Sequence, residues 1–278
     1  MRLLSIISCL IVFILSCSSA VAKDSLVILS RALKDDNIER TSDKLFYDTF
    51  SHALKDEFTT TFQWTNHARL IRRLESDEAV CSYNIIKTPQ REKLFEFSHI
   101  PTSMHIQRKI YGDKETLKNL PETVSVSKLL AQYKTFGAVS SVSYEQLDKM
   151  FSNYHDQVVS LHGADSFTQL AQLLLHKRVN LIVNYDSVMK TLLTNEQLAT
   201  LDSRKIAEYP EFVTGHFVCS RPPKGSKALD IINAYMSTPQ MYNFIKKTHF
   251  SAFDKQTATN MLSEFKNKYN LSPSESIY

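Results

Sequence analysis

The strongest chemical signal in this sequence is an arginine that follows a helix-start pattern. Residues 81–98 read CSYNIIKTPQREKLFEFS, in which Thr88 can cap a helical turn, the next residue is proline, and Arg91 falls within that turn. A guanidinium holds a carboxylate through two parallel hydrogen bonds. The turn follows a strand-like run, and the carboxyl ends of strands are where ligands contact open α/β sheets. Arg91 therefore predicts anion binding; a surface arginine paired with Glu92 or Glu96 is the simpler alternative.

A second group of polar residues follows strand-like runs later in the chain. Ser143 with Gln146 has the spacing of a capping box, and so does Ser166 with Gln169, so we expect a helix to begin at each place. Unpaired N–H groups at a helix start favour an anion. Tyr185 ends the run LIVNY. These residues are candidates for a second wall of the same site.

Motifs for catalysis and for cofactors are missing from the sequence. Its five glycines form neither a phosphate loop nor a dinucleotide fingerprint, and its nine histidines include no metal-binding spacing. No G-x-S-x-G nucleophile motif occurs. The net charge of +4 is dispersed, whereas nucleic-acid binding needs a concentrated basic face. We therefore expect no enzyme, no cofactor, no metal and no nucleic-acid partner.

The N-terminus has the pattern of a secretory signal peptide. Met1 and Arg2 precede an apolar run at 3–15, and an A-x-A site ends at Ala22. The run is shorter than the roughly 20 residues of a membrane-spanning helix. Lipidation at Cys17 is a weaker alternative to cleavage after Ala22. The mature chain is therefore expected to be exported.

Two cysteines, Cys81 and Cys219, remain after removal of residues 1–22, and both lie in apolar, strand-like runs. In an oxidising compartment they would form a disulfide if their strands are neighbours. Two separate buried thiols are the alternative, and the sequence does not decide between them.

Strand-like and helix-like segments alternate along the mature chain, which favours an α/β fold with mainly parallel sheets. The first unit has expected strands at 26–30, 60–64 and 79–84, with helices at 43–57 and at HARLIRRL (67–74). The second has strands at 136–139, 158–161 and 181–185, with helices from about 144 and at about 167–177.

An extended stretch at 95–111 separates the two units, and the run GHFVCS at 215–220 comes after the second. Too little chain follows for a third sheet, so this strand most economically rejoins the first unit. We expect one lobe at 23–110 and 213–278, including helices at about 226–237, 239–248 and 256–269, and another at 111–212. Chain crossings near 110 and 212 would act as a hinge over a cleft between the lobes.

At these residues the chain resembles the bacterial extracellular solute-binding proteins of family 3, the periplasmic components of polar amino acid uptake systems. The resemblance is carried by four segments and spans the mature chain. They are TPQREKLFEFS (88–98), FGAVSSVSYEQLDKM (136–150), LAQLLLHKRVNLIVNY (170–185) and GHFVCSRPPKGSKALDIINAYM (215–236). The two cysteines and the KTPQR motif are most similar to an uncharacterised branch of this family.

The resemblance implies the two-lobed α/β fold of type II periplasmic binding proteins, with two crossover hinge strands. It also implies a ligand site, in which Arg91 binds a carboxylate; its other residues are Thr88, Tyr83, Asn84, Ser143, Tyr144 and Tyr185. The sequence departs from the family where the ligand's amino group would be bound, because Tyr185 takes the place of an acid and Asp186 comes one step later. The family's Pro-rich and Gly-rich segment after the first strand is replaced by RALKDDNIERTSDK.

The expected function is capture of a small carboxylate-bearing or zwitterionic, amino-acid-like solute in the periplasm. The expected partner is the permease of an ABC-type uptake system, and the protein is expected to be a monomer. The alternative is a periplasmic sensor or accessory protein that presents ligand occupancy to a membrane receptor.

Overall fold

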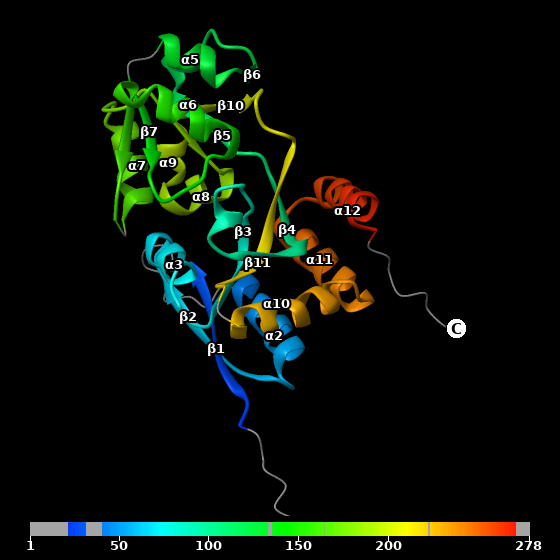
Figure 1. Ribbon diagram of the computed structural model, residues 1–278. Helices are drawn as coiled ribbons and strands as arrows, with labels where there is room; N and C mark the ends of the chain where they lie inside the picture. Colours follow the sequence, from blue (N-terminus) through cyan, green and yellow to red (C-terminus); the bar gives the residue numbers. More distant parts are fainter. Residues whose placement is uncertain (1–21, 32–40, 133–134, 164, 222, 271–278) are drawn as a thin grey trace, which may run out of the picture.

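The computed structural model describes residues 22–31, 41–132, 135–163, 165–221 and 223–270. The expected signal peptide lies outside them except for Ala22, as do Cys17, the tail at 271–278 and most of the segment that replaces the Pro-rich and Gly-rich one. The described chain forms two α/β lobes, each built on its own sheet (Figure 1).

The sheet of the first lobe has the strand order β2-β1-β3-β11-β4. β1 pairs in parallel with β2 and β3, whereas β11 lies antiparallel between β3 and β4. The late strand therefore rejoins the first unit, as expected, but the sheet is mixed rather than mainly parallel. The strands are β1 Asp24–Arg31, β2 Phe58–Thr65, β3 Val80–Ile86, β4 Glu96–Ile106 and β11 Phe212–Cys219.

Helices cover both faces of this sheet (Figure 1). In α2, Phe46, Phe50 and Leu54 recur every four residues, so they share one face, and all three are buried in the largest core cluster together with residues of α10, α11 and α12. Leu70 and Leu74 of α3 pack in a smaller cluster with Leu29 and Val218. These helices are α2 Thr41–Leu54, α3 His67–Leu74, α10 Pro223–Met236, α11 Pro239–Ala252 and α12 Lys255–Tyr269.

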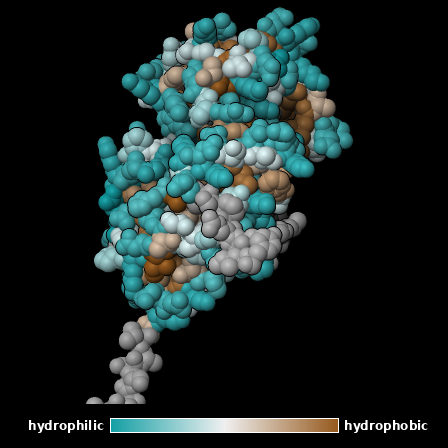
Figure 2. Space-filling view, turned by 90° about the vertical axis from the view of Figure 1, so that its right-hand side faces the viewer, coloured by the Kyte–Doolittle hydropathy of each residue, from teal (hydrophilic) through white to brown (hydrophobic). Residues whose placement is uncertain are grey.

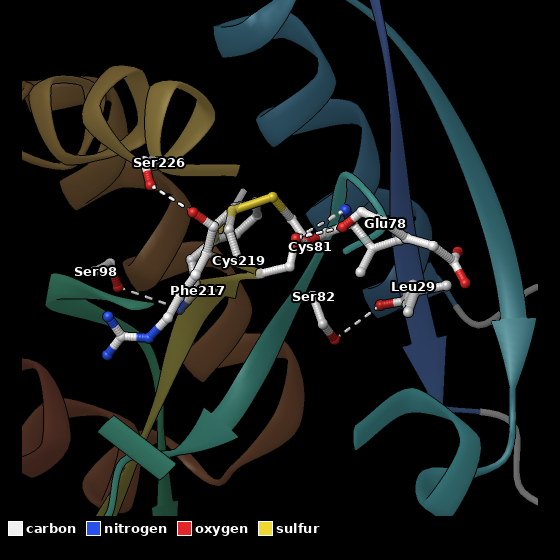
Figure 3. The surroundings of a disulfide bond; sticks show 11 residues. Leu29, Glu78, Cys81, Ser82, Ser98, Phe217, Cys219 and Ser226 are labelled. Atoms are coloured by element: carbon white, nitrogen blue, oxygen red, sulfur yellow. Dashed lines mark hydrogen bonds between the residues drawn. A yellow bond between two sulfur atoms is a disulfide. The ribbon is translucent and has the colours of Figure 1, made fainter. Parts of the chain in front are cut away.

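A disulfide joins Cys81 of β3 to Cys219 of β11 (Figure 3). The two residues lie opposite each other in the antiparallel pair, with Cα atoms 4.1 Å apart, and neither is exposed. Nearby residues of β3 and β11 bond to the neighbouring strands. The Ser82 hydroxyl donates to the Leu29 carbonyl of β1, and the Phe217 N–H donates to Ser98 Oγ of β4. The choice that the sequence left open is thus settled in favour of a disulfide.

The sheet of the second lobe has the order β6-β10-β5-β9-β7-β8 and is also mixed. β7 runs parallel to β8 and β9, whereas β5 is antiparallel to β9 and β10. Its strands are β5 Lys109–Asp113, β6 Thr123–Val124, β7 Phe136–Val139, β8 Val158–Leu161, β9 Leu181–Asn184 and β10 Leu201–Ile206. Its helices are α4 Lys114–Leu117, α5 Val126–Gln132, α6 Asp148–Asn153, α7 Ser166–Leu175, α8 Asp186–Leu192 and α9 Asn195–Leu198.

Helix α7 begins where the sequence predicts, but its predicted capping box is wrong. Asp165 precedes the helix, and Ser166 is its first residue. The Ser166 hydroxyl donates to the Gly163 carbonyl at 2.7 Å instead of accepting from the N–H of Gln169, whose backbone N–H bonds the Asp165 carbonyl.

The chain passes between the sheets twice, after β4 and after β10, and the two crossings lie side by side. The Gln107 N–H donates to the Glu211 carbonyl at 3.0 Å, and Gln107 Oε1 accepts from the Ile206 N–H at 3.2 Å. Movement of one crossing is therefore coupled to the other, as a hinge of two strands requires.

Within the described ranges, no helix combines the length and the apolar character needed to cross a membrane. The face drawn in Figure 2 is mainly hydrophilic, with apolar residues in small separate groups. Among the described residues, the large apolar side chains that are clearly exposed are Leu94, Val159 and Phe250, which belong to different elements.

Candidate ligand-binding site

A small cavity lies beside the first crossing, where the carboxyl end of β1 faces the second lobe. Its volume is about 20 Å³, and it is partly open to solvent. Arg31 comes from the first lobe and Arg108 from the crossing, and the other lining residues come from the second lobe. They are Val142, Tyr144, Phe167, Val183, Asn184, Tyr185 and Val188.

Arg108 is the central cation of this cavity. Its side chain is 6% exposed, and its Nη1 donates to the Ser143 carbonyl at 2.8 Å. The guanidinium carbon lies 4.8 Å from the ring centre of Tyr185 and 5.1 Å from that of Tyr144, both within cation–π range. Burial opposes the charge, but the neighbouring phenols and Glu145 raise the pKa of Arg108 overall. Arg108 is thus a desolvated, permanently positive group held between two rings.

Arg31 supplies a second cation from the opposite lobe. It is the last residue of β1, and its guanidinium carbon lies 5.4 Å from the ring centre of Phe167 in α7. This contact joins the two lobes across the cavity. Two guanidinium groups on one cavity that has a mainly apolar lining favour an anionic occupant.

The predicted turn at Thr88 and Arg91 is present. Thr88 Oγ1 accepts from the Arg91 N–H at 3.3 Å, and Arg91–Lys93 forms the 3-10 helix η1. Arg91 Nη1 donates to the Ile86 carbonyl at 3.0 Å. Burial lowers the pKa of Arg91 to about 10, with Asp148 acting in the opposite direction. Arg91 is therefore charged and interacts electrostatically with Asp148 of the second lobe, but neither it nor Thr88 lines the cavity.

Tyr83 and Asn84 lie away from the cavity lining. The Tyr83 ring stacks on Phe46 at 4.6 Å in the core of the first lobe, and its hydroxyl donates to Asp43. Asn84 has a left-handed backbone with φ of 58°. Its Oδ1 lies 2.6 Å from His105 Nε2 and accepts from the Ser103 hydroxyl at 2.8 Å. Both side chains are thus used within the first lobe.

Ser143 and Tyr144 form a turn whose donors already have an acceptor. Asp148 accepts from the Tyr144 N–H at 2.6 Å and from the Ser143 hydroxyl at 2.7 Å. The predicted capping box with Gln146 is wrong: Ser143 Oγ accepts from the N–H of Glu145, and helix α6 begins only at Asp148. The chain's own carboxylate therefore occupies the place expected for an external anion.

Tyr185 reaches the cavity, whereas the acid beside it does not. The Tyr185 ring packs on Arg108 and lies 5.9 Å from the ring of His105. Asp186 pairs with Lys109 Nζ at 2.7 Å and accepts from the Tyr111 hydroxyl. The acid that could receive a ligand's amino group is thus already neutralised by a lysine.

Glu145 is a carboxylate close to Arg108. Among the described residues, its buried Oε1 has no hydrogen-bond partner. Its Oε1 lies 4.0 Å from Arg108 Nη1, and its backbone is left-handed with φ of 54°. Burial raises the pKa of Glu145, and Arg108 opposes that rise. It contributes to the charge balance around Arg108 without lining the cavity.

The two-lobed fold is similar to that of several solved binding proteins. An ancestral arginine-binding protein bound to glutamine has a TM-score of 0.58 and 17% identity, over 87% of this chain and 97% of that one. The amino acid ABC transporter substrate-binding protein AbpA of Streptococcus pneumoniae, bound to L-arginine, has a TM-score of 0.56 and 14% identity, over 88% and 94%. These proteins share the two-lobed type II architecture. The chain has the type II periplasmic-binding-protein fold.

A histidine kinase sensor domain similar to periplasmic binding proteins has this fold as well, with a TM-score of 0.56 and 11% identity, over 80% of this chain and 93% of that one. No protein-family model matches the sequence, and no curated protein matches it. In this type II periplasmic-binding-protein fold, the cavity lies between the two lobes, next to the hinge. Across the residues that the structure describes, no three potential metal ligands lie together.

Sequence reasoning found Tyr144 and Tyr185 among the lining residues but missed Arg31 and Arg108. A sequence signal exists for Arg31, because it directly follows the apolar strand LVILS, as Arg91 follows its strand. Arg108 lies at the edge of an extended stretch with no helix start beside it, so local pattern gives no reason to select it.

We expect the free energy of unfolding to fall as the pH drops from about 6.5 to about 4. Burial lowers the pKa of His216 and of His105 to about 4 each, and that of His67 to about 3. An unfolded histidine titrates near 6.5, so between these values the unfolded chain binds more protons than the fold. Each histidine then contributes a slope of up to about 1.4 kcal/mol per pH unit.

Urea unfolding at several pH values in this window tests the expectation. His216→Gln should reduce the slope, because it removes a buried group whose Nδ1 lies 2.9 Å from the Ser98 carbonyl. His155→Gln is the control, since the His155 side chain is 76% exposed. Equal slopes for all three proteins would contradict the assignment.

Proposed function

We propose that the protein captures a small carboxylate-bearing or zwitterionic solute, similar to an amino acid, between its two lobes. The observation that carries this proposal is the buried guanidinium of Arg108 at a cavity whose opposite wall holds Arg31. Closure around a bound carboxylate would remove water from both partners, which strengthens their attraction in a lower effective dielectric.

We further propose that the chain is exported to the periplasm after removal of residues 1–22 and delivers its ligand to an ABC-type permease. The lobes would comprise 23–110 with 213–278, and 111–212, except that β5 of the second sheet begins at Lys109 and β11 of the first sheet begins at Phe212. The amino acid ABC transporter protein of Streptococcus pneumoniae, named above, supports this role by its fold. The protein would act as a monomer, without catalytic activity or cofactor.

The test is direct identification of a bound solute. Protein purified from its native host compartment is denatured, and the released small molecules are identified by mass spectrometry. The same compounds are then titrated into stripped protein by calorimetry, and closure is followed as a decrease in the radius of gyration. A carboxylate that binds and closes the lobes is the expected result. The titration also includes a panel of small carboxylates. If neither the released compounds nor any carboxylate of this panel binds, the proposal is overturned.

A sensor role is the second candidate, supported by the likeness to a histidine kinase sensor domain. The same ligand would then change contacts with a membrane receptor instead of a permease. Genes next to the coding sequence separate the two roles: permease and ATPase genes favour uptake, whereas a sensor kinase or cyclase gene favours signalling.

Arg91→Ala is expected to weaken ligand binding by about 1 kcal/mol, or roughly fivefold. In this proposal Arg91 does not contact the ligand, because its Nη1 donates to the Ile86 carbonyl and it does not line the cavity. Its charge would attract the ligand carboxylate from a longer distance. Calorimetry on the variant measures the change, with exposed Lys93→Ala of the same 3-10 helix as control. A loss of a hundredfold or more would instead make Arg91 the main carboxylate ligand.

A further inference from the structure

We infer that the outer face of α11, formed by Lys246, Lys247 and Phe250, binds a membrane surface that contains anionic phospholipids. This inference goes beyond the proposed capture of a solute and does not depend on it. It follows from the spacing of the three side chains, from the surplus of positive charge on α11 and α12, and from the way the nearby acids are used.

Phe250 is a large aromatic side chain that the fold leaves exposed. It is 40% exposed, whereas Phe244 and Ile245 of the same helix are buried on its inner face. Lys246 and Lys247 are exposed as well, and they precede Phe250 by four and three residues. Residues at these spacings are neighbours on the surface of a helix. The phenyl ring therefore shares the outer face of α11 with two lysine side chains.

Positive charge dominates α11, α12 and the turn between them. This segment carries five lysines and two acids, Asp254 and Glu264, which gives a net charge of +3, while the whole chain carries +4. The helical pair thus has a surplus of positive charge nearly as large as that of the entire protein. Its lysines are Lys246, Lys247, Lys255, Lys266 and Lys268.

The two acids do not pair with these lysines. Asp254 caps the start of α12, where its Oδ1 accepts from the Thr257 N–H and its Oδ2 accepts from the Thr257 hydroxyl. Across the described residues, neither Glu264 nor any of the five lysines belongs to an ion pair. The lysines of α10 differ, because Lys224 and Lys227 each pair with a carboxylate of the first lobe, at 2.7 and 2.6 Å. The ammonium groups of α11 are therefore available to an external anion.

An exposed aromatic ring beside lysines is typical of a helix that lies on a membrane surface. The ring enters the boundary between headgroups and acyl chains, while the ammonium groups stay at the depth of the lipid phosphates and the aliphatic stems of the lysines cover apolar surface. The lysines of α12 add attraction over the screening length of roughly 10 Å at about 0.1 M salt. An acidic polypeptide would satisfy the lysines but not the ring, so a membrane accounts for both.

This face of α11 is separate from the cavity. The described lining of the cavity includes no residue of α11 or α12. Both helices pack on the core of the first lobe and lie at the right-hand side of that lobe in Figure 1. Binding through α11 therefore leaves the residues of the cavity uncovered.

Vesicle sedimentation tests the inference. The chain from Lys23 to Tyr278 is used, because the apolar run at 3–15 would enter membranes by itself. We expect it to sediment with vesicles made of equal parts of phosphatidylglycerol and phosphatidylcholine but not with vesicles of phosphatidylcholine alone. Salt at about 1 M, where the screening length is roughly 3 Å, should release it. Equal binding to both kinds of vesicle, or binding to neither, would overturn the inference and leave the proposed solute capture standing.

Two variants locate the binding on α11. Replacing both Lys246 and Lys247 with glutamine should weaken binding to the anionic vesicles by about tenfold or more. Phe250→Ala should weaken it by about threefold or more. The control replaces Lys128 and Lys149 with glutamine, which removes two exposed lysines from the second lobe and should leave the affinity almost unchanged. Equal losses in the two lysine variants, or no loss with Phe250→Ala, would overturn the inference.

Soluble polyglutamate separates a membrane from an acidic protein as the partner. At equal concentrations of negative charge, the protein should bind the anionic vesicles more tightly than polyglutamate, because only the vesicles offer the Phe250 ring an apolar environment. Phe250→Ala should weaken binding to the vesicles but not to polyglutamate. Tighter binding to polyglutamate would assign this face of α11 to an acidic protein and would overturn the inference.

Discussion

Arg108→Met is expected to weaken ligand binding by about 2 to 5 kcal/mol, the range for truncating one partner of a buried charge pair. Methionine keeps much of the length and the apolar stem of arginine but removes the charge and the donors. When the lobes close, the ligand carboxylate would then lose its water without gaining a cationic partner at position 108. Calorimetry with the identified solute measures the loss, and thermal unfolding without ligand checks that the variant is folded.

Two further variants separate charge from geometry at this position. Arg108→Lys retains the charge but lacks the planar fork that packs on Tyr144 and Tyr185, so an intermediate loss is expected. Arg69→Met removes an exposed arginine from α3 and should have no effect. A loss below threefold for folded Arg108→Met would exclude Arg108 from ligand binding.

Replacing both Cys81 and Cys219 with alanine is expected to lower the free energy of unfolding by about 4 to 5 kcal/mol. The disulfide joins residues 138 positions apart, and a loop of that length loses much conformational entropy in the unfolded chain when it is closed. Alanine avoids placing a new polar group in the core, where both cysteines are fully buried. Urea unfolding of the oxidised protein and of the variant gives the difference.

Reduction provides the matched control for the disulfide. The parent protein unfolded in the presence of a thiol reductant should approach the stability of the double variant, while the variant itself should not respond to reductant. A difference below about 1 kcal/mol between the oxidised parent and the variant would mean that the native strands are held together equally well without the bond.

Strongly periodic segments of this fold could be predicted from the sequence. Phe46, Phe50 and Leu54 mark α2, and the apolar runs that form β1, β3 and β11 are each long enough to be recognised. Elements of two to seven residues between 114 and 132 were missed, because α4, β6 and α5 are too short to establish a period. The mixed direction of both sheets was missed as well, since strand direction depends on tertiary connections.

The site was less predictable than the fold because its geometry depends on competition between side chains. The Ser143 pattern predicted a helix start, but the chain forms a turn there, and Asp148, five residues later, takes the donors that the pattern offers. Arg91 belongs to a recognisable motif. Arg108, by contrast, becomes a candidate only because the fold brings the first crossing against Tyr144 and Tyr185. Such convergence cannot be seen in local spacing.

The position of β11 between β3 and β4 has a consequence for the order in which the molecule can assemble. The strands of the second lobe are consecutive in the chain, from Lys109 to Ile206, so that lobe can mature as soon as its own residues have emerged. In the first lobe, the place between β3 and β4 stays empty until Phe212–Cys219 arrives, and only then can Cys219 meet Cys81. During vectorial synthesis or translocation, the inserted lobe is completed first, and the lobe that begins the chain is completed last.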